Sequence, residues 1–349
     1  MTSFIRSFLT CLAMAVLIPT VADAAVRSPD PGRPLSTHLG IEGTHFTINS
    51  KPVFLYGISY YGALGASEDF MRQDLADMQR DGFNWIRVWA NWSSSSNNVS
   101  AIDEKGEPRS PFLQRLQWLM AECDRRGVVV DVTLTRGNGS RSSPRLQTLA
   151  AHRQAVETLI HGLKTHANWY LDLSNERNVR DARFTSIQDL KELRDLVKQL
   201  DPTRLVTASD GGDISKDALQ GYLLDAQLDF IAPHRPRDQD SPAQTEAKSR
   251  EYFAWMKQFG RVTPLHYQEP FRRGYGKWQP TAKDYAADLR GAIAGGAAGW
   301  CFHNGSSRSS EGPQRSFDLT RKRLYEQLDQ EELAALKELQ TVIASRQAK

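Results

Sequence analysis

Cysteine is scarce in this chain, with only three in 349 residues. Cys11 falls in an N-terminal segment that we expect to be removed, which leaves Cys123 and Cys301. Two residues cannot form the disulfide framework typical of small secreted domains, although a single bridge between them stays open. Because Cys123 falls in a helical pattern and Cys301 in a strand pattern, we expect two buried thiols that pack as small hydrophobic groups.

The motifs of metal-binding, nucleotide-binding and nucleic-acid-binding proteins are also missing. The sequence has no zinc-ligand spacing, no glycine-rich loop of the kind that holds phosphates, and no basic helix with interleaved aromatic residues. The formal net charge of +3 is too small an excess to indicate nucleic acid. We therefore expect no cofactor, no metal ion and no nucleic-acid partner.

Long apolar runs are absent except near the N-terminus, where Phe8 to Ile18 follow the positively charged Arg6. Ala22-Asp23-Ala24 then resembles a cleavage site, so we interpret residues 1–24 as a signal peptide and expect a secreted or periplasmic protein. An uncleaved anchor helix is the alternative, but the run is shorter than the roughly 20 residues needed to span a bilayer. After cleavage we expect a monomer that does not insert into a membrane.

The remaining chain divides into a short leader and one domain. Residues 25–38 contain three prolines and predict a flexible leader. Residues 39–349 have the length of one large α/β domain. Near its start, the alternating run from Phe46 is broken by Asn49-Ser50, which predicts a small β-hairpin before the first main strand.

Short apolar runs then alternate with amphipathic segments eight times. The expected strands lie near residues 53–58, 85–89, 128–134, 169–173, 205–208, 230–232, 264–267 and 299–302. The expected helices cover residues 68–80, 112–126, 146–166, 186–200, 244–259, 282–294 and 319–345. Apolar strands separated by helices indicate a parallel sheet, and eight repeats favour a closed (β/α)8 TIM barrel. An open doubly wound sheet would need a dinucleotide-type glycine pattern after the first strand, and the spacing there differs.

Two glutamates follow strands of this predicted barrel. Glu176 comes after the fourth strand and Glu269 after the seventh. The active site of such a barrel lies at the carboxyl ends of its strands, so both side chains should reach it. A pair of carboxyl groups suits a reaction that needs a proton donor and a nucleophile on opposite sides of a scissile bond.

Around these glutamates the sequence resembles the glycoside hydrolases of clan A, which include family 5, the cellulase and mannanase family. The resemblance is carried by residues 46–53, by Gly82 to Trp89, by Asn175-Glu176, by Glu269 and by Trp300. It therefore extends over nearly all of the chain after the leader. It implies a retaining glycosidase acting on a β-linked oligosaccharide or polysaccharide.

The resemblance also implies roles for individual residues. Glu269 would attack the anomeric carbon while Glu176 protonates the leaving oxygen and later deprotonates water. The substrate-binding residues that it implies are Asn175 on the sugar 2-hydroxyl, Arg87 beneath Glu269, His234 as an orienting group and Trp300 as the platform of the sugar subsite.

The chain departs from the family pattern in two places. The related enzymes tend to carry a tyrosine two residues after the histidine, whereas here His234 is followed by Arg235, Pro236 and Arg237. Tyr267, two residues before Glu269, is our candidate for the missing hydroxyl, since alternate residues of a strand share a face. The third strand also ends without the histidine that the family often carries there.

Other side chains near the strand ends suggest how a glycan is held. Trp89 joins Trp300 as our strongest candidate for stacking against a sugar ring, with core packing as the alternative. Several arginines fall in loops on the same face and would suit an acidic glycan, although a solvated surface is the commoner explanation. They are Arg136, Arg235, Arg237, Arg272 and Arg273.

Two other functions remain open at this point. Glu176, His234 and Glu269 could be ligands in a metal-dependent barrel enzyme instead of acid and nucleophile. The chain could also be a glycan-binding barrel that has kept the cleft and lost turnover. The presence of both glutamates favours the glycosidase.

Overall fold

The computed structural model describes residues 37–94, 97–135, 146–179, 184–308, 310 and 314–347. The predicted signal peptide, residues 1–24, lies outside this part of the chain, as does the leader up to residue 36.

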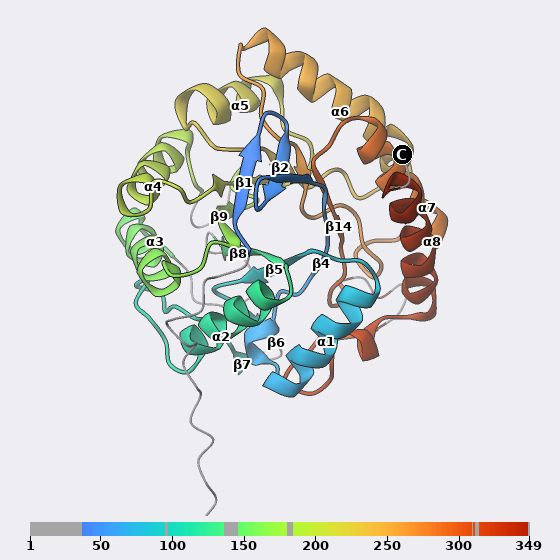
Figure 1. The fold of residues 1–349 in the computed structure, drawn as a ribbon, viewed down its shortest axis with the longest axis horizontal. Coiled ribbons are helices and arrows are strands. Elements are labelled where there is room, and N and C mark those ends of the chain that lie inside the picture. Colours follow the sequence, from blue (N-terminus) through green and yellow to red (C-terminus); the bar gives the residue numbers. More distant parts are fainter. Residues whose placement is uncertain are drawn as a thin grey trace, which may run out of the picture. The chain divides into compact units, whose positions relative to one another are not determined.

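Parallel strands form a closed ring, which confirms the predicted (β/α)8 barrel (Figure 1). One sheet has the order β10-β9-β8-β5-β4-β14-β13. Its members are β4 (Leu55–Ser59), β5 (Trp85–Trp89), β8 (Val129–Thr135), β9 (Trp169–Asn175), β10 (Val206–Thr207), β13 (His266–Tyr267) and β14 (Gly299–Phe302). The gap between β10 and β13 is filled by the parallel pair β11 (Ser209–Asp210) and β12 (Ala232–Pro233). A parallel bridge from Ile231 to Leu265 completes the ring.

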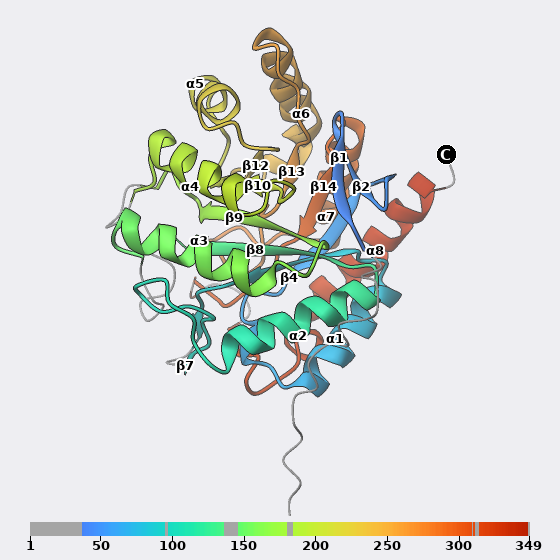
Figure 2. The same cartoon turned by 60° about the vertical axis from the view of Figure 1, so that its left-hand side comes forward.

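Helices surround the strands, and their ends follow signals that are visible in the sequence. They are α1 (Glu68–Arg80), α2 (Phe112–Arg125), α3 (Leu149–Leu163), α4 (Ile187–Leu200), α5 (Lys216–Gln220), α6 (Ser241–Gln258), α7 (Ala282–Ala294) and α8 (Gln330–Gln347). Ser67 caps α1 by accepting a hydrogen bond from the amide of Phe70. Ser186 and Asp189 form a capping box at the start of α4, which satisfies amides that the helix leaves without partners. Figure 2 shows β8 and β9 side by side, with α2 and α3 outside them.

Two parts of the secondary structure differ from the expectation. The short helix α5 and the π-helical turn Gly221–Asp225 were not predicted, because together they are too short to show a clear helical period. The predicted helix from residue 319 begins only at Gln330. Before it, the amide of Leu324 donates to Asp74 of α1, so a tertiary contact holds this segment in another conformation.

A three-stranded antiparallel sheet precedes the barrel, formed by β1 (Leu39–Glu42), β2 (His45–Ile48) and β3 (Lys51–Val53). The amide of Leu39 donates to the carbonyl of Ala167, just before β9. Phe46 of β2 packs against Phe230 in the barrel interior at a ring distance of 5.0 Å. The sheet therefore closes the end at which the strands begin, and leaves the opposite end for a site.

Cys123 and Cys301 are free and buried, as predicted. Cys123 lies in α2 and Cys301 in β14, where the Cys301 side chain belongs to the cluster that fills the barrel. Within the described ranges, no helix combines the length and the apolar character needed to cross a membrane.

Gly57 of β4 offers a test of the packing inside the barrel wall. A Cβ at this position would lie 2.0 Å from the carbonyl oxygen of Trp85, which is backbone and cannot move aside cheaply. We expect Gly57→Ala to lower the free energy of unfolding by about 1–3 kcal/mol, measured by urea denaturation. Gly276→Ala is the matched control, because a Cβ there meets nothing within 4 Å. Equal stability of the two variants would contradict this packing.

Candidate active site

Arg87 lies at the centre of the site, fully buried on β5, and binds three carboxylates. Its Nε lies 3.1 Å from Asp131 of β8 and its Nη2 lies 2.9 Å from Asp172 of β9. Its Nη1 donates to Glu269 Oε2 at 2.5 Å. Nη2 also donates to the side-chain oxygen of Asn175, at 3.1 Å. A buried cation is costly without partners, so these contacts fix the carboxylates in place.

Glu176 occupies a sharp turn at the end of β9. The strand continues to Asn175, two residues beyond its predicted end, and the Glu176 backbone then adopts a φ of 46°. A positive φ is uncommon for a residue with a side chain. The Glu176 amide donates to Ser209 Oγ at 3.0 Å, which helps to hold the turn.

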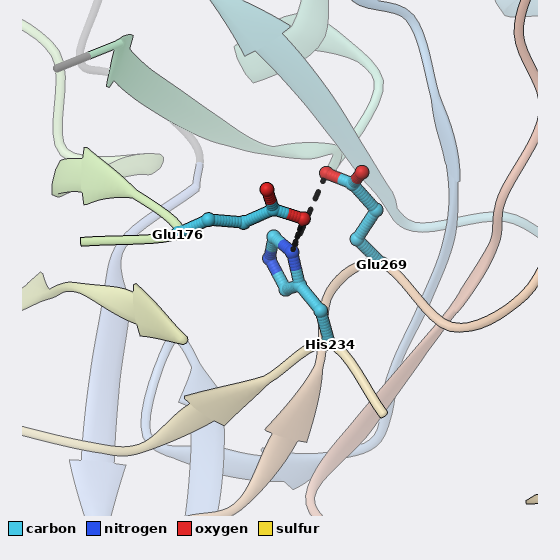
Figure 3. A group of neighbouring side chains, drawn as sticks. All are labelled: Glu176, His234 and Glu269. Carbon is cyan, nitrogen blue, oxygen red and sulfur yellow. Dashed lines mark hydrogen bonds and ion pairs between the residues drawn. The ribbon is translucent and has the colours of Figure 1, made fainter. Parts of the chain in front are cut away.

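The two predicted glutamates meet across His234, which follows β12 (Figure 3). His234 Nδ1 lies 3.3 Å from Glu176 Oε1 and 3.7 Å from Glu269 Oε2. One oxygen of each glutamate and a nitrogen of His234 all lie within 4.8 Å of one another. The structure thus brings together three side chains from the ends of three different strands.

Arg237 joins the same pair of glutamates, which the sequence had not suggested. Its Nη2 donates to Glu176 Oε1 at 3.2 Å and to Glu269 Oε1 at 2.7 Å. From the sequence, Arg237 was only one of the loop arginines. The departure from the family pattern after His234 was the signal that could have drawn attention to it.

The charges around the glutamates favour their ionised forms. Burial would raise the pKa of Glu176, but the hydrogen bond from His234 and the charges of His234 and Arg237 outweigh it and lower the pKa to about 2. Burial likewise opposes ionisation of Glu269, and the charges of His234, Arg237 and Arg87 hold its pKa well below the usual range. Both glutamates are therefore carboxylates in the unliganded site.

His303 is a further site residue that the sequence analysis missed. It is the first residue after β14, and its Nδ1 donates to the carbonyl of Pro270 at 2.5 Å. Its Nε2 lies 3.5 Å from Glu269 Oε1 and has no hydrogen-bond partner among the described residues. Burial lowers the pKa of His303 well below its usual value, so Nε2 can accept a hydrogen bond from a ligand hydroxyl. Its place directly after the eighth strand was the available signal.

A cavity of about 460 Å³ opens beside Glu269. Aromatic rings form one wall: Trp89 lies 5.1 Å from Tyr61 and 4.9 Å from Trp92, measured between ring centres. The structure therefore places Trp89 where a sugar ring could pack against it. Glu176 is not among the residues that line this cavity, whereas Arg237 is.

Trp300 and Tyr267 do not reach the site, so both predictions were wrong. Trp300 is fully buried and its indole nitrogen donates to Asp288 of α7 at 2.7 Å. It points outward because its neighbour Cys301 points into the barrel. The Tyr267 hydroxyl contacts Ser249 of α6 at 2.7 Å. The strand alternation used to place it fails because β13 ends at Tyr267, before Glu269.

The five loop arginines of the acidic-glycan hypothesis divide into two groups. Arg235 pairs with Asp213, and Arg273 pairs with Asp329, so neither contributes to the cavity wall. Arg237 and Arg272 do line the cavity. The fifth, Arg136, lies outside the described residues.

The alternative of a metal centre meets an electrostatic objection. Glu176, His234 and Glu269 could supply three ligand atoms. However, Arg237 donates to both carboxylates and Arg87 donates to Glu269, so a metal ion would lie beside two guanidinium cations. Like charges at such short range repel strongly, and the donor set therefore fits a metal poorly.

Comparison with known proteins identifies the family of this site. The model of the glycosyl hydrolases family 2, TIM barrel domain, matches residues 39–248, more than half of the chain. No curated protein matches the sequence.

Solved structures share the fold at low sequence identity. The endo-1,4-beta-mannanase of Rhizomucor miehei has a TM-score of 0.62 and 13% identity over 88% of this chain and 99% of its own. The glycoside hydrolase family 5 mannosidase of the same organism has a TM-score of 0.63 and 14% identity over 91% and 100%. The endo-1,4-beta-D-mannanase of Thermotoga petrophila has a TM-score of 0.56 and 14% identity over 83% and 99%. The resemblance to clan A glycosidases is thereby confirmed.

The low pKa of Glu176 makes stability depend on pH. A carboxyl group whose pKa falls on folding stabilises the protein above its unfolded pKa of 4.5, and this contribution is lost as the pH falls toward 2. We therefore expect the difference in free energy of unfolding between wild type and Glu176→Gln to shrink between about pH 5 and pH 2. Urea denaturation at several pH values measures it, with the exposed Glu104→Gln as the baseline. A difference that does not change with pH would contradict the assigned pKa direction.

Proposed function

Because the chain belongs to the glycosyl hydrolases family 2, TIM barrel domain, and is therefore a glycoside hydrolase, we propose that it cleaves a β-linked oligosaccharide or polysaccharide with retention of configuration. The observation that carries this proposal is the short separation of Glu176 and Glu269. Their nearest carboxylate oxygens lie within 4.8 Å. Retaining enzymes hold the two carboxyl groups roughly 5–5.5 Å apart, whereas inverting enzymes need about 6.5–9.5 Å to admit a water molecule.

Glu269 is the nucleophile in this mechanism. Arg87 holds it from inside the barrel and Arg237 from the other side, so it is ionised and its position is fixed. Attack on the anomeric carbon forms a glycosyl ester with Glu269 and breaks the bond to the leaving oxygen. Forming the ester removes the negative charge of Glu269.

Glu176 is the acid and then the base. It must carry a proton when the glycosidic bond breaks, yet it is ionised in the unliganded site. A substrate that separates Glu176 from Arg237 raises the pKa of Glu176, because the carboxylate loses a cationic partner. In the intermediate, loss of the Glu269 charge lowers the pKa of Glu176 again, which suits its second role as base toward water.

The remaining predicted residues position the sugar. Arg87 orients the amide of Asn175, which we propose meets the 2-hydroxyl of the sugar. His234 donates to Glu176 and keeps it directed toward Glu269. Trp89 provides an apolar surface for the sugar ring.

Product analysis tests the proposal. We expect the wild type to cleave at least one member of a panel of neutral and uronate-containing β-glycans, and the first product seen by NMR to be the β-anomer. Glu269→Ala should abolish cleavage, and Glu176→Ala should lower kcat about 10²–10⁴-fold, since each removes a group that acts on the reacting atoms. The exposed Glu104→Ala is the control and should cleave like wild type.

The other outcomes separate the alternatives. An initial α-anomer would contradict the retaining mechanism. Binding of a glycan without cleavage would support a glycan-binding barrel, a function consistent with the ion pair between Arg237 and Glu176. Loss of cleavage on adding a chelator would favour a metal-dependent mechanism.

We also propose that the protein is exported. This proposal is supported by the sequence of residues 1–24, with Arg6, the apolar run and Ala22-Asp23-Ala24. N-terminal mass spectrometry of protein collected outside the cytoplasm of a bacterial host should find a chain that begins at Ala25. A chain retained in the cytoplasm with residues 1–24 intact would contradict it.

A further inference from the structure

Three arginines surround one tyrosine at the edge of the cavity. The guanidinium carbons of Arg237, Arg272 and Arg308 lie 4.3, 5.4 and 5.6 Å from the ring centre of Tyr275. They come from the segments that follow β12, β13 and β14. All three arginines line the cavity that reaches Glu269.

These arginines have more positive charge than their protein partners neutralise. Arg272 is only 6% exposed and donates from Nη1 to the carbonyls of Arg273 and Gly305, without a carboxylate partner among the described residues. The side chain of Arg308 likewise makes no ion pair within the described ranges. Burial and the neighbouring charge of Arg237 lower the pKa of Arg272 to about 10, which reflects an environment that disfavours its charge. A buried cation of this kind is stabilised when an anion binds beside it.

Arg237 has unused donors as well. Its ion pairs with both glutamates use the same nitrogen, Nη2. Nε and Nη1 make no hydrogen bond to a described residue, so the guanidinium can hold Glu269 and still offer two donors to a ligand in the cavity. These two N–H groups lie on different sides of the guanidinium, so one of them can add a charge-assisted hydrogen bond to a carboxylate or a sulfate in the cavity.

We propose that Arg237, Arg272 and Arg308 form a subsite for an anionic substituent of the glycan, a carboxylate or a sulfate, next to the bond that is cleaved. The proposal rests on the proposed glycosidase function and names its substrate class. Trp89 and Trp92, which line the same cavity, bind the sugar ring, while the arginines bind its anionic group. An anion bound by Nε or Nη1 of Arg237 also weakens the ion pair between this arginine and Glu176. Binding of the anionic group is thereby coupled to freeing Glu176 from its ion pair with Arg237.

The test compares matched substrates. The probes are a β-linked oligosaccharide containing glucuronate, its carboxyl-reduced neutral counterpart and a 6-sulfated neutral counterpart. We expect wild-type kcat/KM to be at least tenfold higher for one or both anionic probes than for the neutral one. Arg272→Gln should lower kcat/KM for the preferred anionic probe about 10- to 100-fold, mainly through KM, and so bring the ratio of anionic to neutral kcat/KM close to one. The exposed Arg321→Gln is the control variant.

A binding measurement separates this proposal from the proposed function. Calorimetry with glucuronate, a 6-sulfated sugar and glucose should show tighter binding of an anionic sugar to wild type, and Arg272→Gln should lose that preference. Arg308→Gln removes an exposed side chain, so it should weaken the preference while it keeps its melting temperature. Preferred binding without any cleavage would support the subsite and contradict the glycosidase. Cleavage of neutral and anionic probes at equal rates, or equal binding of all sugars, would overturn the subsite and leave the glycosidase in place. Preference for the sulfated over the uronate probe would support the subsite and identify sulfate as its ligand.

Discussion

The site depends on one buried cation, the guanidinium of Arg87, and on its three carboxylate partners. Asp131 comes from β8, the neighbour of β5 in the sheet, Asp172 comes from β9, which follows β8, and Glu269 comes from across the barrel. Removing one partner of a buried ion pair typically costs about 3–5 kcal/mol, because it leaves an uncompensated charge. The same contacts therefore stabilise the barrel interior and position the nucleophile. A substitution in this network changes stability and activity together.

The network around Arg87 also divides the carboxylates into two classes. Burial and the nearby charge of Asp172 raise the pKa of Asp131 to about 7, although Arg87 opposes this shift. The pKa of Glu269 moves in the opposite direction, because it meets His234 and Arg237 in addition to Arg87. Asp131 can therefore take up a proton inside the barrel while Glu269 stays ionised at its mouth. The nucleophile keeps its charge because the cations gather on its side of the network.

The sequence was most informative where a local pattern decides the structure. The strand Trp85–Trp89 and the helices Glu68–Arg80 and Ala282–Ala294 have the predicted bounds, since a continuous apolar run or a helical period defines each of them. Side-chain positions were predicted wrongly where they depend on the residue at which a strand ends. Tyr267 was assigned to the site from its distance along a strand, and Trp300 from the family resemblance and its place on the last strand, but the direction of a side chain depends on where the strand stops. Arg237 was named only as a loop arginine and His303 was not named, because contacts between the loops above the barrel form only in the folded chain.

The position of Arg237 has a consequence for how binding energy is used. A general acid works best when its pKa is near the working pH, and Glu176 begins far below it. Each unit by which the pKa rises costs about 1.4 kcal/mol, and the substrate must supply this energy when it binds. A ligand that bound only to the aromatic wall would leave the ion pair between Arg237 and Glu176 intact. Glu176 would then stay ionised and could not protonate the leaving oxygen. A ligand that also binds Arg237 uses part of its binding energy to raise the pKa of Glu176. The same anionic substituent therefore favours both binding and cleavage.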